Sequence, residues 1–153
     1  MASINHSAIL STEPLAVWHL LRQFGAISTW HPEVRLCIIA GGEDTGDGGS
    51  VRTLYLVNGE VLRERLHSID NDEMTLSYVL TGPNVLVSSF SASLSVSSAE
   101  QGTQTLLEWS AHVVSDDEGL EARYESQVGE FVLSAMDGLA EHLGVSIRLD
   151  VEL

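Results

Sequence analysis

Two charged residues that could do chemistry, Arg52 and Glu64, each occupy an otherwise apolar face of a predicted strand. A carboxylate in this setting can move a proton as a general acid or base, and a guanidinium can polarise a carbonyl or stabilise a developing enolate oxygen. Tyr78, on a further apolar strand face, adds a hydroxyl group. Because burying charge costs free energy, the pair indicates either a polar anchor for a ligand or a structural bridge near the rim of a sheet. The sequence leaves both interpretations open.

The pairing of these two charges depends on one hairpin. Side chains alternate between the two faces of a strand, so each charged residue shares its face with leucines. Both leucine-bearing faces point inward only if residues 57–59 form a three-residue loop, which places Arg52 opposite Glu64. We expect Gly59 to be left-handed in this loop, whereas a two-residue Asn-Gly turn would pair Thr53 with Glu64.

The composition argues against several classes of function. Seven basic and 22 acidic residues give a formal charge of −15, which disfavours nucleic acids and anionic membrane surfaces as partners. All seven basic residues are arginine, so no lysine is available for a Schiff base or a P-loop. Cys37 is the single cysteine, and the six histidines lack metal-binding spacing. We therefore expect no metal, no cofactor and a reducing, cytoplasmic setting, and the absence of a long apolar run predicts no membrane span.

The N-terminal third reads as a strand, a helix and a short helical turn. Apolar and polar residues alternate over 3–10, which predicts the strand. The helix begins at Pro14, which suits a first turn, and stops at Gly25. A single turn carrying Trp30 is predicted within 27–34.

The rest of the chain reads as six strands followed by one long helix. Turn residues separate the strands, which are predicted at 35–40, 50–57, 60–69, 74–81, 85–97 and 103–115. A period of 3.6 residues over 118–143, closed by Gly144, predicts a helix about 39 Å long. Only this helix is long enough to cover one face of the sheet. We predict one α+β domain over 1–153, a curved antiparallel sheet of about seven strands wrapped around the C-terminal helix with an internal apolar cavity.

Short motifs along almost the whole chain carry a resemblance to a known superfamily. They are Val17-Trp18, Phe24-Gly25, Trp30-His31-Pro32, Gly49-Ser50-Val51-Arg52, Asn58-Gly59, Glu64, Leu76-Ser77-Tyr78 and Glu108-Trp109-Ser110. On these residues the chain resembles the START-like superfamily, also called SRPBCC or helix-grip, and specifically its bacterial polyketide cyclase/dehydrase and lipid-transport branch. The resemblance implies an apolar cavity between sheet and helix. It implies no single reaction, because members of the superfamily include enzymes, carriers and proteins without known activity.

Strand parity, the helical stripe and the resemblance together predict the cavity lining. The expected ligand-binding residues are Trp30, His31, Leu54, Leu62, Leu76, Phe90, Trp109, Tyr124, Val128 and Phe131. Trp30 would act as a lid and His31 as a titratable group at the entrance, with the alternative that Trp30 fills the core. Trp109 and Tyr78 are either ligand contacts or core residues.

Three functions are compatible with these features. The first is binding of a small hydrophobic, polyketide-, aromatic- or lipid-like ligand by a monomer or homodimer. The second is a cofactor-independent cyclase or dehydratase with Glu64 as general acid or base and with Arg52 and Tyr78 as polar anchors. The third is an interaction module whose acidic surface meets a basic partner.

Overall fold

The strands and helices follow the predicted order, with one strand added at the end. The computed structural model of the chain describes residues 1–40, 48–82, 86–99 and 103–150. Its elements are β1 (Ala2–Leu10), α1 (Pro14–Leu21), the 3-10 helix η1 (Phe24–Thr29), β2 (Val34–Ile39), β3 (Val51–Leu56), β4 (Val61–Asp70), β5 (Thr75–Gly82), β6 (Ser89–Ala99), β7 (Gln104–Val114), α2 (Glu118–Leu143) and β8 (Ile147–Leu149). Val85, the predicted start of the fifth of the six strands, lies outside the described residues, and that strand begins at Ser89.

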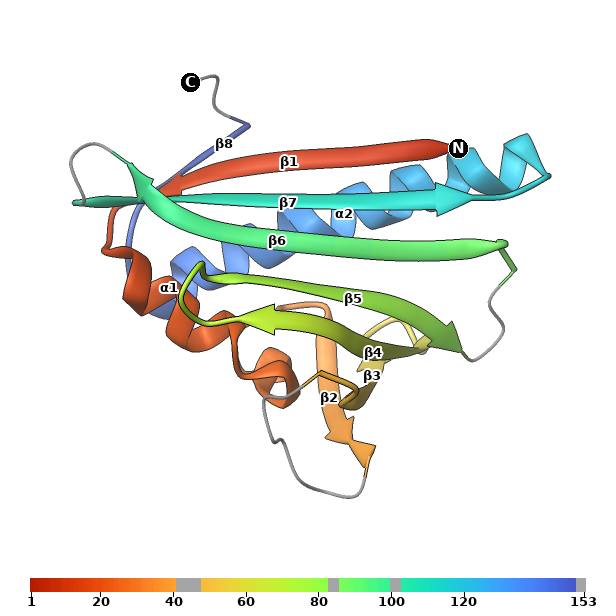
Figure 1. Cartoon of the computed structure of the whole chain (residues 1–153), viewed down its shortest axis with the longest axis horizontal. Coiled ribbons are helices and arrows are strands. Elements are labelled where there is room, and N and C mark those ends of the chain that lie inside the picture. The colour runs from red at the N-terminus through yellow and green to blue at the C-terminus, as the bar shows by residue number, and fades with distance from the viewer. Residues whose placement is uncertain (41–47, 83–85, 100–102, 151–153) are drawn as a thin grey trace.

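All the described strands belong to one antiparallel sheet in the order β2-β3-β4-β5-β6-β7-β1-β8 (Figure 1). Consecutive strands pair from β2 to β7, and β1 then pairs with β7. The eighth strand, β8, pairs with the end of β1 and corrects the predicted number of about seven. A strand of three residues is too short to produce a recognisable alternation, so its pairing was not predictable from pattern.

The helix α2 has the predicted bounds because both of its ends are capped. The side chain of Asp117 accepts a hydrogen bond of 3.1 Å from the backbone of Leu120, and acidic residues in the first turn complement the helix dipole. At the other end Gly144 adopts the left-handed conformation, with φ 69°. The helix runs behind the sheet along β1 and β7 (Figure 1).

The two halves of α2 differ in how closely they approach the rest of the protein. Most small and apolar residues of the second half are buried, and a methyl group added at Gly138 would meet the Trp30 carbonyl oxygen and would lie 2.6 Å from Cδ of Pro32. The apolar residues of the first half are only partly buried, and they are Leu120, Tyr124, Val128 and Phe131. Close packing at one end and looser packing at the other leave space between the first half of α2 and the sheet.

The segment before β2 differs from its prediction in detail. The helix α1 ends at Leu21, four residues before Gly25, and η1 begins at Phe24 instead of near Ile27. Gln23 leaves helical geometry with ψ 81°, because the chain turns there to bury Phe24 and Ile27 in the core. Trp30 follows η1 directly and is buried.

None of the described helices combines the length and the apolar character that a membrane crossing would require.

Candidate functional site

Arg52 lies directly opposite Glu64 in the paired strands β3 and β4. The hairpin that joins these strands closes through a backbone hydrogen bond of 2.9 Å from Leu56 to Glu60. Gly59 in the loop has a φ of 93°, the left-handed conformation that glycine adopts without steric cost. The predicted three-residue loop and its register are therefore confirmed, and the two-residue turn is not adopted.

The Arg52–Glu64 ion pair is almost completely buried, with 5% and 4% of the two residues exposed. Nε of Arg52 donates to Oε1 of Glu64 at 2.9 Å, and Nη2 lies 2.8 Å from the same oxygen. Nη1 donates to the carbonyl oxygen of Phe24 at 2.9 Å. The guanidinium carbon also lies 3.8 Å from the centre of the Phe24 ring and 5.3 Å from that of Tyr78. These contacts hold Arg52 in place, and Arg52 in turn fixes the orientation of Glu64.

The second carboxylate oxygen of Glu64 is left for another partner. Both contacts of the ion pair end on Oε1, and no described residue donates a hydrogen bond to Oε2. Among the described side chains, Nε1 of Trp30 is the one polar atom that is both fully enclosed and without a partner. Oε2 of Glu64 is not such an atom, so it is not fully enclosed in the core. Since Glu64 lines a pocket, Oε2 is an available acceptor on the pocket wall.

Tyr78 lines the same pocket and supplies a donor. Its hydroxyl oxygen accepts a hydrogen bond of 3.3 Å from Nε1 of Trp109. An indole nitrogen can only donate, so the proton of the Tyr78 hydroxyl remains available to an acceptor. Burial, together with the nearby charge of Glu64, raises the pKa of Tyr78 well above its usual range. The hydroxyl therefore keeps its proton at any physiological pH.

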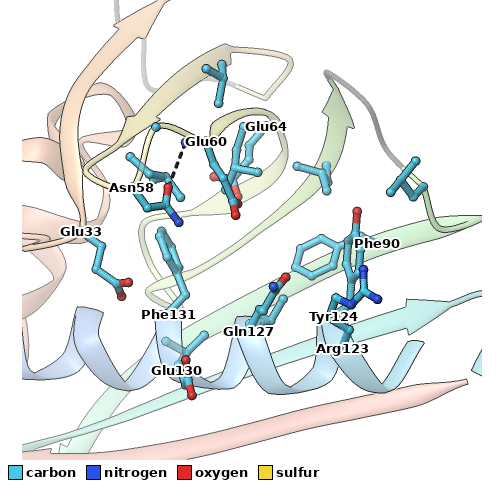
Figure 2. Close-up of a pocket in the computed structure, with 18 of the residues that line it drawn as sticks. Glu33, Asn58, Glu60, Glu64, Phe90, Arg123, Tyr124, Gln127, Glu130 and Phe131 are labelled. Atoms are coloured by element: carbon cyan, nitrogen blue, oxygen red, sulfur yellow. Dashed lines mark hydrogen bonds between the residues drawn. The ribbon is translucent and has the colours of Figure 1, made fainter. Parts of the chain in front are cut away.

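The pocket itself has a volume of about 750 Å³ and lies between the first half of α2 and the strands β3 to β6. Its apolar wall comes from strand residues and from the α2 stripe, and consists of Leu56, Val61, Leu62, Leu80, Leu86, Phe90, Leu120, Val128, Phe131 and Val132. Its polar lining consists of Glu33, Asn58, Glu60, Glu64, Tyr78, Arg123, Tyr124, Gln127 and Glu130, most of which Figure 2 labels. The lining is thus more polar than the predicted apolar cavity, because the β3–β4 hairpin and the flanks of the helical stripe add charged side chains.

The structure brings about half of the predicted site residues together at this pocket. Those that line it are Leu62, Glu64, Tyr78, Phe90, Tyr124, Val128 and Phe131. Those that do not line it are Arg52, Trp30, His31, Leu54, Leu76 and Trp109, all of which are buried. Arg52 stands behind Glu64, and Trp109 stands behind Tyr78, so both contact a lining residue. Trp30 is 7% exposed and belongs to the buried core, which agrees with the alternative of a core-filling residue.

His31 connects two sides of the pocket without lining it. Its Nδ1 accepts a hydrogen bond of 3.1 Å from the backbone of Glu33, so Nε2 carries the proton and donates to the carbonyl oxygen of Phe131 at 3.1 Å. The His31 and Phe131 rings are 4.1 Å apart. Burial lowers the pKa of His31 to about 4. The hydrogen bond to Phe131 acts in the opposite direction and raises this pKa, whereas the charge of Arg52 lowers it further. His31 is therefore a neutral link at physiological pH.

Several lining residues were not among the predicted site. The polar ones on α2 are Arg123, Gln127 and Glu130, which flank the apolar stripe at the spacing of one helix face. Their spacing along the helix was visible in the sequence. The prediction followed apolar residues only, so it included the centre of the stripe and missed the polar residues beside it. Glu33 and Glu60 lie in turns, where sequence pattern gives no direction for a side chain.

Solved structures of similar fold come from several bacteria. A protein called XoxI from Bacillus cereus superposes with a TM-score of 0.78 at 20% identity, covering 92% of this chain and 94% of that one. A protein from Thermobifida fusca gives a TM-score of 0.79 at 26% identity with 94% of each chain covered. A protein from Nitrosospira multiformis gives 0.77 at 20% identity over 92% of this chain and 94% of the other. Among curated proteins no match is found.

The sequence pattern of one protein family covers nearly the whole chain. The family is described as polyketide cyclase / dehydrase and lipid transport, and its pattern matches residues 1–144. The match spans the strands β1 to β7 and all of α2, and so includes every wall of the pocket. The chain therefore belongs to the polyketide cyclase/dehydrase and lipid transport family.

Proposed function

We propose that the protein binds a small hydrophobic molecule, polyketide-, aromatic- or lipid-like, in the pocket between α2 and the strands β3 to β6. The volume of about 750 Å³ falls within the range of about 300–1,000 Å³ that is usual for small-molecule sites. The apolar wall would take the body of the ligand, and family membership supports a hydrophobic ligand.

One observation carries this proposal: a buried carboxylate on the pocket wall has one oxygen committed and one oxygen available. The Arg52–Glu64 pair loses solvation when it is buried, and apolar residues of similar size would often stabilise the fold as well. Its placement on a pocket wall is explained if Oε2 accepts a hydrogen bond from a ligand. The hydroxyl proton of Tyr78 offers the complementary donor. The pair of groups suits a ligand that carries a hydroxyl group beside a carbonyl or second hydroxyl.

A pocket-filling substitution tests the binding function. Val128 is half-buried on α2 and lines the pocket, so Val128→Trp would place an indole where the ligand lies. Ser126 is exposed on the same helix and is not a lining residue, which makes Ser126→Trp the matched control. We expect the uncharged fluorescent probe N-phenyl-1-naphthylamine to bind the natural protein and the control, and to bind Val128→Trp more weakly. Equal binding by Val128→Trp, or no binding by any of the three proteins, would contradict the proposal.

Native mass spectrometry of freshly purified protein addresses the identity of the ligand. A bound apolar mass that leaves only on denaturation, and that is reduced in Val128→Trp, would be the expected result. Solvent extraction of the same sample would then give its chemical class.

A second candidate function is cofactor-independent cyclisation or dehydration, and the same two groups favour it. Oε2 of Glu64 would remove a proton from a carbon between two carbonyl groups, and the Tyr78 hydroxyl would donate to the enolate oxygen that forms. Attack of the enolate carbon on a third, more distant carbonyl of the chain would form the new C–C bond and close a ring. The π bond of that carbonyl would break to an alkoxide, which would take the proton back from Glu64. Arg52, whose guanidinium is bound to Glu64 and to the carbonyl oxygen of Phe24, would be a positioning residue for Glu64.

The two functions separate on substitution of Glu64. Glu64→Gln keeps the shape of the side chain and a hydrogen bond acceptor but cannot take a proton. Under the enzyme hypothesis, turnover of a poly-β-ketone would fall by about 10²-fold or more, the usual contribution of a general base. Turnover unchanged by Glu64→Gln would exclude this role while leaving the binding function intact.

A further inference from the structure

Glu64 presents one unused hydrogen bond acceptor to the pocket. The residue is 4% exposed, and both Nε and Nη2 of Arg52 contact its Oε1. The remaining nitrogen of the guanidinium, Nη1, is bound to the carbonyl oxygen of Phe24. Oε2 therefore has no donor among the described residues, and a buried acceptor without a donor costs free energy. A ligand that donates a hydrogen bond to Oε2 removes this cost.

Tyr78 presents a group of the opposite kind from the neighbouring strand. In the pairing of β4 with β5, Glu64 lies two residues from the direct partner of Tyr78, so the two polar side chains are diagonal neighbours on one face of the sheet. The Tyr78 hydroxyl accepts from Trp109 and faces a ligand as a donor. A hydroxyl, ether or carboxylate oxygen of a ligand can accept from Tyr78 equally. Glu64 alone discriminates among these groups, because its Oε2 requires a proton from the ligand.

The pocket offers a carboxylate ligand no comparable place. A carboxylate has no proton to donate to Oε2, and its charge would lie beside that of Glu64. Arg123 is the one cationic residue of the described lining, and it is exposed on α2, on the opposite side of the pocket from Glu64 (Figure 2). A ligand that turned its carboxylate toward Arg123 would leave Oε2 without a donor. Both orientations therefore disfavour an acid.

We propose that the pocket accepts apolar molecules that carry a neutral hydroxyl group, as in alcohols, phenols and enols, and rejects carboxylates of the same size, with Glu64 as the residue that sets this selectivity. The inference rests on the proposed binding function and specifies its ligand class. The ligand hydroxyl donates to Oε2 of Glu64 and accepts from Tyr78, and the apolar body lies along Phe90 and Val128. Free fatty acids belong to the rejected class.

Three ligands with the same number of carbon atoms test this selectivity on the natural protein. Decanol, its isomer methyl nonyl ether, and decanoate, each below its micelle-forming concentration, would compete with N-phenyl-1-naphthylamine at pH 7. Decanol and the ether can both accept from Tyr78, but only decanol can donate to Glu64. Since a hydrogen bond to a charged group contributes more than a neutral one, we expect decanol to bind about tenfold more tightly than the ether. Decanoate should also bind about tenfold more weakly than decanol.

Glu64→Gln should reverse the selectivity, because it reverses the polarity of the group that faces the pocket. Arg52 can only donate, so the carbonyl oxygen of the new amide would stay on Arg52 and the NH2 group would face the ligand. The variant thus presents a donor in place of an acceptor and leaves the charge of Arg52 unbalanced. We expect the preference for decanol over the ether to fall by about threefold or more, and decanoate to bind at least as tightly as decanol.

A control variant separates this local effect from the formal charge of −15, which disfavours every anion. Glu125→Gln removes one negative charge from an exposed residue of α2 that does not line the pocket. It should leave the relative affinities of the three ligands as they are in the natural protein. If Glu64→Gln does not fold, the comparison of decanol with its isomer in the natural protein still decides the inference.

The outcomes distinguish this inference from the proposed function. If the natural protein binds the ether or decanoate as tightly as decanol, the selectivity is overturned while the binding function stands. If Glu64→Gln folds and keeps the natural order of the three ligands, the apolar wall and not Glu64 rejects the acid, and the inference is also overturned. If the probe itself does not bind, the proposed function fails first.

Discussion

The indole nitrogen of Trp109 donates a hydrogen bond of 3.3 Å to the hydroxyl oxygen of Tyr78, inside the sheet and next to the pocket. Both residues are nearly inaccessible to solvent, at 2% and 4% exposed. The bond fixes the direction of the hydroxyl group, because it occupies the acceptor side of the oxygen and leaves the proton free to point elsewhere. Trp109, which does not line the pocket, therefore sets the orientation of Tyr78, which does.

Removing the Tyr78 hydroxyl should cost stability even without a ligand. Tyr78→Phe leaves Nε1 of Trp109 buried without an acceptor, and an unsatisfied buried donor costs about 1–3 kcal/mol. Urea unfolding should show this loss, whereas Tyr55→Phe, on a half-buried ring of β3, should stay within about 0.5 kcal/mol of the natural protein. Equal stability of the two variants would contradict the assigned bond.

Breaking the buried ion pair should be more damaging than removing it whole. Arg52→Met leaves the carboxylate of Glu64 buried without its cation, which costs about 3–5 kcal/mol in comparable pairs. The double variant Arg52→Met/Glu64→Leu removes both charges and should recover at least about 1 kcal/mol of that loss. Arg63→Met, at an exposed position of β4, is the control. A double variant less stable than Arg52→Met would contradict the expectation that the unpaired charge of Glu64 causes the loss of stability in Arg52→Met.

The register of the Arg52–Glu64 hairpin was predictable because it follows from a parity rule. Only a three-residue loop keeps the leucines of both strands on one face, and a shift by one residue would turn a whole set of apolar side chains to solvent. The C-terminal end of α2 was also predictable, because Gly144 closes the helical period and is the left-handed cap of the helix.

Parity could not tell which inward residues face the pocket and which lie beneath the helix. Leu54 and Leu76 point to the same side of the sheet as Leu62 and Tyr78, yet only the latter two line the pocket. The difference depends on how α2 sits across the sheet, which is fixed by the close contact at Gly138. That contact joins residues far apart in sequence, so no local pattern contains it.

Gly138 should therefore be far less tolerant of a side chain than a second buried glycine of α2. Gly138→Ala would place a methyl group against the Trp30 carbonyl oxygen and 2.6 Å from Cδ of Pro32, and overpacking of this kind costs about 1–3 kcal/mol or more. Gly129→Ala meets only Nε2 of His6 at 3.5 Å and Cγ2 of Ile4 at 4.0 Å, so the helix preference for alanine should stabilise it by up to about 1 kcal/mol. Thermal unfolding of the two variants gives the comparison. Similar melting temperatures would contradict the close approach of α2 at Gly138.

Stability should fall as the pH drops below neutral, and His31 should account for a separable part of the fall. The pKa of His31 is lowered from 6.5 to about 4 in the folded protein, mainly by burial, so between these values the unfolded chain binds more protons than the folded one. The contribution is fully present above pH 6.5 and is lost progressively toward pH 4, by on the order of 1–3 kcal/mol. The lowered pKa values of Asp150 and Glu121 act only below about pH 5, because carboxyl groups of the unfolded chain titrate there.

The pH range from 6.5 to 5 therefore isolates the histidine contribution. We expect the slope of unfolding free energy against pH in this range to be reduced in His31→Gln and unchanged in His67→Gln, whose side chain is exposed on β4. Because the slope is compared, a general loss of stability in His31→Gln does not affect the result. A slope in His31→Gln equal to that of the natural protein would show that His31 is not the neutral link between Glu33 and Phe131.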